Sequence, residues 1–446
     1  MRISRRRVNP YADRVNSSCV TKSSEAQMIR FLTVLILSCL SWSASAANVR
    51  VTPLGTESVL QLDGMLTSGR AHFLPPAVRP AGYRWPGYVR AKYPVRIYRV
   101  EYRSAIPERT GKSEEASGLI AIPIIPGASS MPLLSYQHGT VFGRYQVPSY
   151  AFSKTNPSGY PQYSGAFETR LMVAQYAGQG YVVIAPDYFG LGDSSGPEAY
   201  MVKRSEQRAC LDLYRAALTF LARRGIRPSR LFLAGWSQGG LVTTAFLEKL
   251  QSLDINVTAA FTAASPNDPF ATLNAWLYHP TARDPVWENA IIALSVFSYQ
   301  YYESAPGLAK SIIRPKYYAA FKRIYTRNYR NMGDLYAILA HIAQHRGGLL
   351  AYLRAPYASP TYLADSRFGK YLAKSETYRE LFEAPVRMYY GTQDQVIRVP
   401  LAQLAARYQR AMGGRSIRLE EVPDANHRGT FLAAAAGSLA WFNGFR

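Results

Sequence analysis

Short apolar segments alternate with amphipathic helical patterns along much of this 446-residue chain, and no other feature constrains its fold as strongly. Strands that are covered on both faces are expected to be continuous apolar runs, and these segments are of that kind. The alternation predicts a mostly parallel sheet flanked by helices, in the α/β class. We expect strands at residues 95–104, 117–123, 132–137, 181–185, 230–235, 257–262, 386–390 and 416–422, and helices at about 164–178, 203–223, 239–250, 400–411 and 429–442.

The alternation stops between about 269 and 383, in a stretch rich in Tyr, Ala and Arg. Helical periodicity persists there in pieces such as 287–303 and 334–345. An insertion at this point predicts a helical lid over the carboxyl ends of the strands, where doubly wound sheets bind ligands. The expected domains are an α/β core at 47–268 and 384–446 and a helical lid insertion at 269–383. Within the core, the proline-rich residues 47–94 are expected to form an irregular arm.

An apolar run at residues 28–42 follows a basic segment and precedes Ala44-Ser45-Ala46. This order of basic region, short apolar region and small residues is typical of a signal peptide. We therefore expect residues 1–46 to be a signal peptide with an N-terminal extension, cleaved after Ala46, and the mature protein to be secreted or periplasmic. Lipid attachment at Cys39 is a weaker alternative, and translation could start at Met1 or Met28.

The positions of the three cysteines decide whether the mature protein can contain a disulfide. Cys19 and Cys39 lie in the segment expected to be removed, so Cys210 alone is left and no internal disulfide can form. Cys210 lies in an amphipathic helical pattern, which favours a packed cysteine over a nucleophile.

The net charge is +23, but the basic residues are scattered and form no dense arm, so we expect no nucleic-acid partner. Peripheral contact with an anionic surface is a weaker expectation.

The strongest local signal is Gly-Trp-Ser-Gln-Gly-Gly at 235–240. It matches the G-x-S-x-G nucleophile-elbow pattern and stands between an expected strand and an expected helix, as that pattern requires. Glycines let neighbouring backbone pass close beneath Ser237, while the helix directs amide groups and a partial positive charge toward the reacting group. We predict that Ser237 is a catalytic nucleophile.

A serine nucleophile needs a positioned base, and His427 is the candidate. It follows the last expected strand and precedes the final helix, where a loop could carry its ring over the sheet edge toward Ser237. Asp394 follows the strand at 386–390 and is the expected carboxylate that orients the imidazole. The chain order Ser–Asp–His is the usual one for this pattern. Asp268 is the competing carboxylate.

Two backbone amides are expected to form an oxyanion hole. One belongs to Gln238, and the other to Thr140, in the turn Gln-His-Gly-Thr at 137–140. Gly139 permits a close approach in that turn. We expect the substrate pocket to be lined by His138, Tyr188, Phe189 and Trp236.

Four ordered segments resemble the α/β-hydrolases of the secretory lipase and esterase branch, which includes cell-wall-degrading esterases secreted by plant-associated bacteria. They are Tyr-Gln-His-Gly-Thr at 136–140, Ala-Pro-Asp-Tyr-Phe-Gly-Leu-Gly at 185–192, Gly-Trp-Ser-Gln-Gly-Gly at 235–240, and Tyr-Gly-Thr-Gln-Asp at 390–394 with Asn426-His427. The resemblance covers roughly 95–445 and implies an α/β-hydrolase fold. It also implies hydrolysis of carboxylic esters through an acyl-serine, beneath a lid of variable sequence that determines the substrate.

The expected function is therefore a secreted carboxylic ester hydrolase, monomeric, that acts on a lipid or an acylated cell-wall polysaccharide. A serine peptidase with the same three side chains, or a non-catalytic binding protein on this fold, are the alternatives. His341 and His345 share a helix face at i, i+4 spacing, which could suit a metal, but no Glu motif accompanies them. We expect no metal and no organic cofactor.

Overall fold

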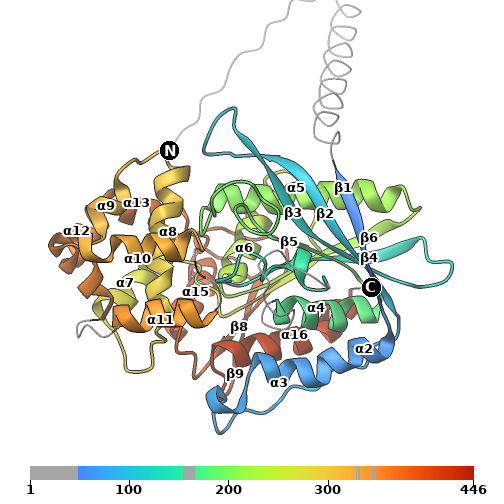
Figure 1. Ribbon diagram of the computed structural model, residues 1–446. Helices are drawn as coiled ribbons and strands as arrows, with labels where there is room; N and C mark the ends of the chain where they lie inside the picture. Colours follow the sequence, from blue (N-terminus) through green and yellow to red (C-terminus); the bar gives the residue numbers. More distant parts are fainter. Residues whose placement is uncertain (1–48, 154–165, 328, 330–331, 344–347, 446) are drawn as a thin grey trace, which may run out of the picture. The chain divides into compact units, whose positions relative to one another are not determined.

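The computed structural model describes residues 49–153, 166–327, 329, 332–343 and 348–445. Its elements are built around a nine-stranded sheet with the strand order β1-β2-β3-β5-β4-β6-β7-β8-β9 (Figure 1). The strands are β1 (Arg50–Glu57), β2 (Val95–Ala105), β3 (Ser113–Pro123), β4 (Ser130–Gln137), β5 (Val182–Pro186), β6 (Arg227–Trp236), β7 (Ala259–Ala263), β8 (Val386–Gly391) and β9 (Ile417–Val422).

Strand direction divides the sheet into two parts. From β5 through β4, β6, β7 and β8 to β9 every neighbouring pair is parallel, whereas β1, β2, β3 and β5 pair antiparallel. The expected mostly parallel sheet is thus confirmed. The chain passes from β4 to β5 on one side and then crosses to β6 on the other. The turns after β4 and β6 therefore meet at the switch point where such sheets bind ligands.

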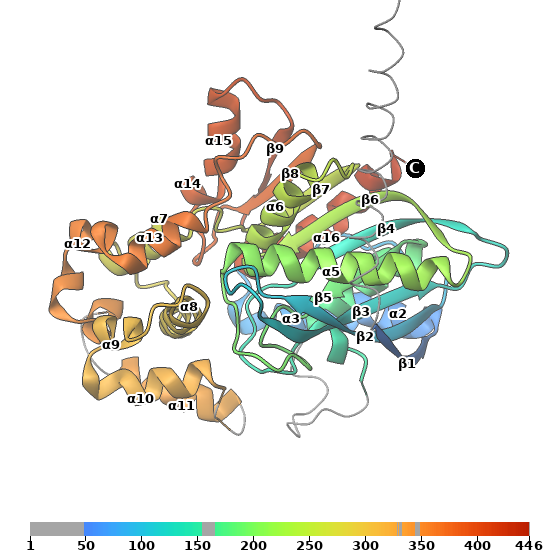
Figure 2. The ribbon, with the colours of Figure 1, turned by 90° about the horizontal axis from the view of Figure 1, so that it is seen from above.

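Helices cover both faces of the sheet (Figures 1 and 2). Helices α5 (Lys203–Ala222) and α6 (Gln238–Gln251) pack on one face, and α4 (Phe167–Tyr176) and α16 (His427–Asn443) on the other. Strand β5 shows the division, because Val182 and Ile184 join the α5–α6 core while Val183 and Ala185 join the α4–α16 core. Alternate side chains of one strand point to opposite faces, so a strand buried on both faces reads as a continuous apolar run.

The helices expected along the core are present, with shifted ends. The pattern at 400–411 is divided by Gln403 into α14 (Val399–Ala402) and α15 (Leu404–Ala411). The final helix starts at His427, two residues before the expected position. Cys210 is fully buried in α5 as a free cysteine, which confirms the expectation of a packed residue.

The expectation of an irregular arm at 47–94 is wrong in its first part. β1 extends the sheet by pairing antiparallel with β2, and α2 (Val59–Gly64) and α3 (Arg70–Phe73) follow it. The strand was not predicted because Pro53 and Gly55 are both unfavourable in a central strand. An edge strand tolerates them, and the register here shifts between Pro53 and Gly55, as at a β-bulge.

The chain between β7 and β8 is helical, and we call residues 269–383 the insertion. Its helices form a group at one side of the sheet in Figures 1 and 2. They include the two expected helical pieces, now α8 and α11. The helices are α7 (Pro269–Tyr278), α8 (Glu288–Tyr302), α9 (Leu308–Ile312), α10 (Pro315–Tyr325), α11 (Met332–Ala343), α12 (Pro360–Asp365) and α13 (Arg367–Lys374).

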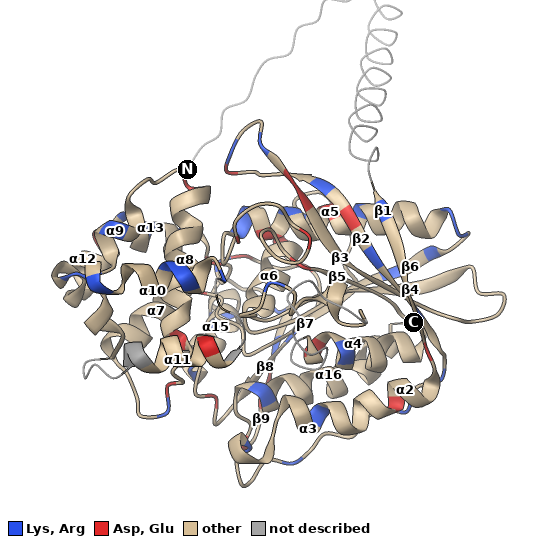
Figure 3. Cartoon of the chain, viewed as in Figure 1, with Lys and Arg blue, Asp and Glu red and all other residues tan. Residues whose placement is uncertain are grey.

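Charged side chains are distributed over the core and the insertion. Figure 3 shows Lys and Arg on many elements, interspersed with Asp and Glu, with no single element that gathers the basic residues. Across the residues that the model describes, no helix has both the length and the apolar content needed to cross a bilayer.

Candidate active site

Ser237 lies at the sharp turn where β6 ends and α6 begins. Its backbone dihedrals are φ 57° and ψ −124°, a strained combination for a residue that has a Cβ atom. Two flanking glycines permit the turn by close approach. A Cβ atom on Gly235 would lie 2.1 Å from the carbonyl oxygen of Gly239, and one on Gly239 would lie 2.0 Å from that of Gln137. The small residues of the motif are therefore required by the backbone itself.

His427 is the first residue of α16, and not part of a loop before it as expected. The helix starts early because the side chain of Asn426 caps it, accepting a hydrogen bond from the backbone N–H of Gly429 at 2.9 Å. The indole N–H of Trp236 donates to the carbonyl oxygen of His427 at 3.0 Å. With its backbone held in this way, His427 places Nε2 2.9 Å from Oγ of Ser237.

Asp394 lies on the other side of the imidazole. Nδ1 of His427 is 3.1 Å from Oδ2 and 3.2 Å from Oδ1 of Asp394. Oδ1 also accepts the backbone N–H groups of Val396 and Ile397, at 2.8 and 2.9 Å, so the carboxylate is fixed by the turn after β8. The competing Asp268 instead caps α7, accepting the N–H of Ala271 at 2.9 Å. The structure thus brings Asp394, and not Asp268, to the imidazole.

The three side chains form one hydrogen-bonded row that is almost closed to solvent. The side chains of His427 and Asp394 are 4% and 1% exposed, and Ser237 is 8% exposed. A carboxylate on Nδ1 fixes that nitrogen as the N–H donor, which leaves Nε2 free to accept a proton from the serine hydroxyl. This arrangement can turn a weak oxygen nucleophile into a reactive one.

The two amides expected to stabilise an oxyanion come from adjacent turns. Gln238 is the first residue of α6, so its N–H has no acceptor within the helix. Its side chain is tied down, because Nε2 donates to Oε1 of Glu206 at 2.8 Å. Thr140 follows β4, and its hydroxyl lies 2.9 Å from the hydroxyl of Tyr200. Ser237 and Thr140 line the same cavity.

That cavity has a volume of about 320 Å³. Six aromatic side chains contribute to its wall, together with polar residues and one cationic side chain, Arg428, next to His427. Besides Ser237, His427 and Thr140, the lining residues are Phe73, Val141, Phe142, Gln146, Ala166, Phe167, Glu168, Trp236, Trp287, Tyr336, Gln395 and Arg428.

Of the four residues expected to line the pocket, Trp236 does so, and the other three are placed elsewhere. Tyr188 and Phe189 are buried in the core, and the Tyr188 hydroxyl donates to the carbonyl oxygen of His138 at 3.0 Å. His138 stacks on Tyr188 with ring centroids 4.3 Å apart. Burial lowers the pKa of His138 to about 4, so the ring is neutral at pH 7 and supports the turn. The side chains of His138, Tyr188 and Phe189 are therefore directed into the core.

Glu168 is a site residue that the sequence did not reveal. It lies on α4, and its carboxyl accepts the N–H of Gly139 at 3.0 Å and the hydroxyl of Tyr136 at 2.6 Å. Burial raises the pKa of Glu168 to about 7, although these hydrogen bonds oppose the rise. The contact joins residues 29 positions apart, and no local pattern marks it.

No metal site is evident in the described part of the chain, where no group of three or more His, Cys, Asp or Glu side chains could hold an ion. The side chains of His341 and His345 lie outside the described residues.

Comparisons with known proteins identify the family and the fold. The model of the alpha/beta hydrolase family matches residues 138–437. A Legionella pneumophila protein provisionally assigned as a hydrolase has a similar structure, with 23% identity over 89% of this chain and 97% of that chain and a TM-score of 0.71. The rice cell wall degrading esterase LipA from Xanthomonas oryzae, in a ligand-bound form, gives 19% identity, 89% and 98% coverage, and a TM-score of 0.71.

Candida antarctica lipase A is similar over 75% of this chain and 73% of its own, with 18% identity and a TM-score of 0.58. No curated protein sequence matches this chain. At these identities the solved structures establish a shared fold, and the fold expected from the sequence is confirmed.

Proposed function

This chain belongs to the alpha/beta hydrolase family, and from that premise we propose that it hydrolyses carboxylic esters with Ser237 as nucleophile, His427 as base and Asp394 as the orienting carboxylate. One observation carries the proposal. Nε2 of His427 is 2.9 Å from Oγ of Ser237 while Nδ1 faces Asp394, so a proton can pass from the hydroxyl to the imidazole without any rearrangement.

In the first half-reaction, Oγ of Ser237 attacks the ester carbonyl carbon while His427 Nε2 takes the hydroxyl proton. The negative charge that develops on the carbonyl oxygen is stabilised by the amides of Gln238 and Thr140. His427 then donates its proton to the leaving alcohol as the C–O bond breaks, which leaves an acyl-serine. Asp394 stabilises the imidazolium that exists between these two proton transfers.

In the second half-reaction, a water molecule gives its proton to His427 and attacks the acyl carbon. The bond from that carbon to Oγ of Ser237 breaks, and the proton returns to Oγ. A carboxylic acid leaves, and the enzyme is restored. The alcohol leaves before water attacks, so the rate of the second half-reaction should not depend on the alcohol part of the substrate.

The volume and lining of the cavity indicate which acyl groups it can accept. Its volume of about 320 Å³ is at the lower end of the range for small-molecule sites, which is roughly 300–1,000 Å³. Aromatic walls around such a space suit an acyl group of limited length. We therefore propose short or compact acyl groups, attached to a lipid or to a cell-wall polysaccharide.

The test is hydrolysis of short-chain p-nitrophenyl esters by the wild type and by Ser237→Ala. We expect the substitution to lower kcat by at least about 10³-fold, because removal of the nucleophile leaves only the oxyanion contacts and binding. Ser252→Ala, at the far end of α6, serves as the matched control and should retain activity. Equal activity of Ser237→Ala and the wild type would reject the proposal.

A serine peptidase would use the same three side chains on an amide bond. Parallel assays of an ester and an anilide with the same acyl group separate the two functions. We expect the ester to be cleaved and the anilide to react slowly at best, and faster cleavage of the anilide would favour the peptidase.

Export is a further part of the proposal, and it rests on the sequence pattern of residues 1–46. Expression of the full chain in a Gram-negative host, followed by fractionation and N-terminal sequencing, tests it. We expect a mature chain that begins at Ala47 in the periplasm or the medium. An uncleaved cytoplasmic chain would contradict export without affecting the proposed chemistry.

A further inference from the structure

The turn after β4 carries Thr140, and three contacts hold it in place. From the core side, Glu168 accepts the N–H of Gly139 at 3.0 Å. A second contact joins the hydroxyls of Thr140 and Tyr200 at 2.9 Å. The third comes from the insertion, where Nη1 of Arg327 donates to the carbonyl oxygen of Phe142 at 2.9 Å. The amide of Thr140 thus lies between two anchored residues, Gly139 before it and Phe142 after it.

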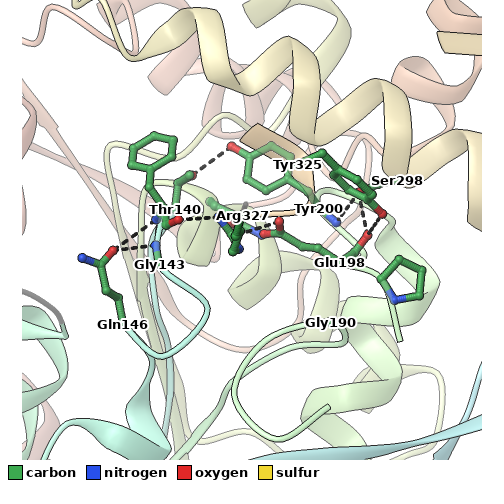
Figure 4. A network of polar contacts seen from close by, with 12 residues as sticks. Thr140, Gly143, Gln146, Gly190, Glu198, Tyr200, Ser298, Tyr325 and Arg327 are labelled. Carbon is green, nitrogen blue, oxygen red and sulfur yellow. Dashed lines mark hydrogen bonds and ion pairs between the residues drawn. The ribbon is translucent and has the colours of Figure 1, made fainter. Parts of the chain in front are cut away.

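Arg327 makes this third contact from the residues that follow α10. Its backbone has φ 52°, in the left-handed region, and its side chain is 7% exposed. Nη2 pairs with Oε2 of Glu198 at 2.6 Å, and the Glu198 side chain is 4% exposed. One guanidinium therefore bridges the Phe142 carbonyl and the Glu198 carboxylate, and its planar fork suits two acceptors at once. Figure 4 shows Arg327 between the Thr140 turn and Glu198.

The segment of Glu198 and Tyr200 is itself bound to the insertion. Ser298 of α8 donates through Oγ to the carbonyl oxygen of Glu198 at 2.7 Å and accepts the N–H of Tyr200 at 3.0 Å. The hydroxyl of Tyr325 in α10 donates to the same carbonyl at 2.9 Å. The insertion consequently reaches the Thr140 turn by two routes, directly through Arg327 and indirectly through Tyr200 (Figure 4).

We infer that Arg327 of the insertion is a positioning residue for the reaction, which holds the Thr140 amide where the oxyanion forms. This inference rests on the proposed function. Phe142 and Thr140 both line the cavity that contains Ser237, whereas Arg327 is not among the residues lining it. Arg327 therefore acts through the turn and does not contact the substrate.

Because Arg327 positions an oxyanion donor, its loss should affect kcat and KM differently. An oxyanion donor is used in the transition state and much less in the ground state, so a displaced amide lowers kcat more than it raises KM. Loss of one complete oxyanion donor costs about 10²–10³-fold in kcat. A donor that is displaced but still present should cost less, about tenfold.

The experiment compares Arg327→Met, Arg327→Lys and wild type on a short-chain p-nitrophenyl ester. We expect kcat to fall by about tenfold or more in Arg327→Met, with KM changed less than about threefold. Lysine restores the charge beside Glu198 but cannot reproduce the fork, so Arg327→Lys should recover part of the loss. The control is Lys374→Met, which removes the exposed ion pair of Lys374 with Glu303 inside the insertion and should leave kcat unchanged.

A boronic acid inhibitor gives a readout that general loosening of the insertion would not produce. It forms a tetrahedral adduct with a serine nucleophile, and that adduct places an oxygen in the oxyanion hole. Its Ki should rise in Arg327→Met by the same factor by which kcat falls. Unchanged kcat in folded Arg327→Met, or equal losses in Arg327→Met and Lys374→Met, would overturn the inference.

If circular dichroism shows that Arg327→Met does not fold, Tyr200→Phe decides the question, because it removes the hydroxyl that contacts Thr140 and leaves the ion pair in place. Tyr200→Phe should then lower kcat by severalfold with little change in KM. Wild-type kcat in Tyr200→Phe would count against the inference. A wild-type protein without esterase activity would instead be a failure of the proposed function.

Discussion

Gly239 has no room for a side chain, because a Cβ atom there would stand 2.0 Å from the carbonyl oxygen of Gln137. That oxygen ends β4, so Gly239 fixes how closely α6 can approach the neighbouring strand. Gly437 in α16 is different, since the nearest atom to its Cβ position is the hydroxyl oxygen of Tyr389 at 3.4 Å. A close backbone contact therefore requires glycine at position 239, whereas position 437 has room for a side chain.

Gly239→Ala should destabilise the protein by about 2–4 kcal/mol, because backbone must move to relieve the overlap. Gly437→Ala should be neutral or stabilising by up to about 1 kcal/mol, since alanine favours the helix and finds ordinary contacts. Urea denaturation of both variants measures the difference in the free energy of unfolding. Equal effects of the two substitutions would contradict this account of the β6–α6 turn.

Glu206 makes stability depend on pH. Burial raises its pKa to about 8, and its Oε1 accepts the Gln238 amide and the N–H of Met201, at 2.8 and 3.0 Å. An unburied glutamate has a pKa of 4.5. Between pH 4.5 and about 8 the unfolded chain therefore releases a proton that the folded chain retains. The free energy of unfolding falls as pH rises through this window, by up to about 1.4 kcal/mol per pH unit.

Glu206→Gln cannot ionise and should lack this decline. The difference in melting temperature between Glu206→Gln and wild type should move in favour of the variant from pH 5 to pH 8.5. Thermal unfolding at several pH values provides the measurement. A difference that stays constant with pH would show that Glu206 is already charged in the folded protein.

At the scale of elements, one cap sets the position of the base. Asn426 begins α16 by accepting the N–H of Gly429 through Oδ1, and its Nδ2 donates to the carbonyl oxygen of Val78 at 2.6 Å. His427 is the next residue. The same side chain therefore ends the loop after β9 and starts the helix on which the imidazole is mounted.

Asn426→Ala should lower the free energy of unfolding by about 1 kcal/mol and reduce kcat, because the first turn of α16 frays where His427 lies. Asn426→Asp keeps the capping oxygen and should retain most of the stability. Chemical denaturation and ester hydrolysis, measured on both variants, test the two effects. Full activity in Asn426→Ala would mean that Trp236 and Asp394 hold His427 without the cap.

Elements were largely predictable from the sequence where the pattern is local. Strand β6 and helix α6 follow from the apolar run at 230–235 and the helical pattern at 239–250, and the motif between them singles out Ser237. Asp394 and His427 were selected for their places after β8 and β9. Strand β1 was missed, because Pro53 and Gly55 are unfavourable in a strand unless it lies at an edge, and an edge is a property of the whole sheet. The pocket assignments of Tyr188 and Phe189 failed because the direction of a side chain in a turn depends on backbone dihedrals such as the φ of 66° at Tyr188.

At the scale of the whole molecule, the contacts that matter most join distant positions. Glu168 and Gly139 meet between α4 and the turn after β4, and Arg327 meets Glu198 across 129 positions. Neither Glu168 nor Arg327 stands in a recognisable motif, and each is one charged side chain among many. No pattern in the sequence distinguishes Arg327 from the other arginines of the insertion, so only the folded arrangement assigns it a role.

The insertion leaves the sheet from β7 and returns to it in β8, and these two strands are direct neighbours, with Ala260 opposite Val386. The two strands are parallel, so the chain leaves at the carboxyl edge of the sheet and returns at the opposite edge. The excursion nevertheless closes on itself, because the N–H of Thr377 donates to the carbonyl oxygen of Asn267 at 2.9 Å, and the length of chain between these two residues costs the fold little entropy. A segment joined in this way is the kind that recombination can exchange as a unit while the strands keep their partners. The limit on such an exchange is chemical, because an incoming segment that lacks a guanidinium at the right place would leave the sheet intact and the turnover slow.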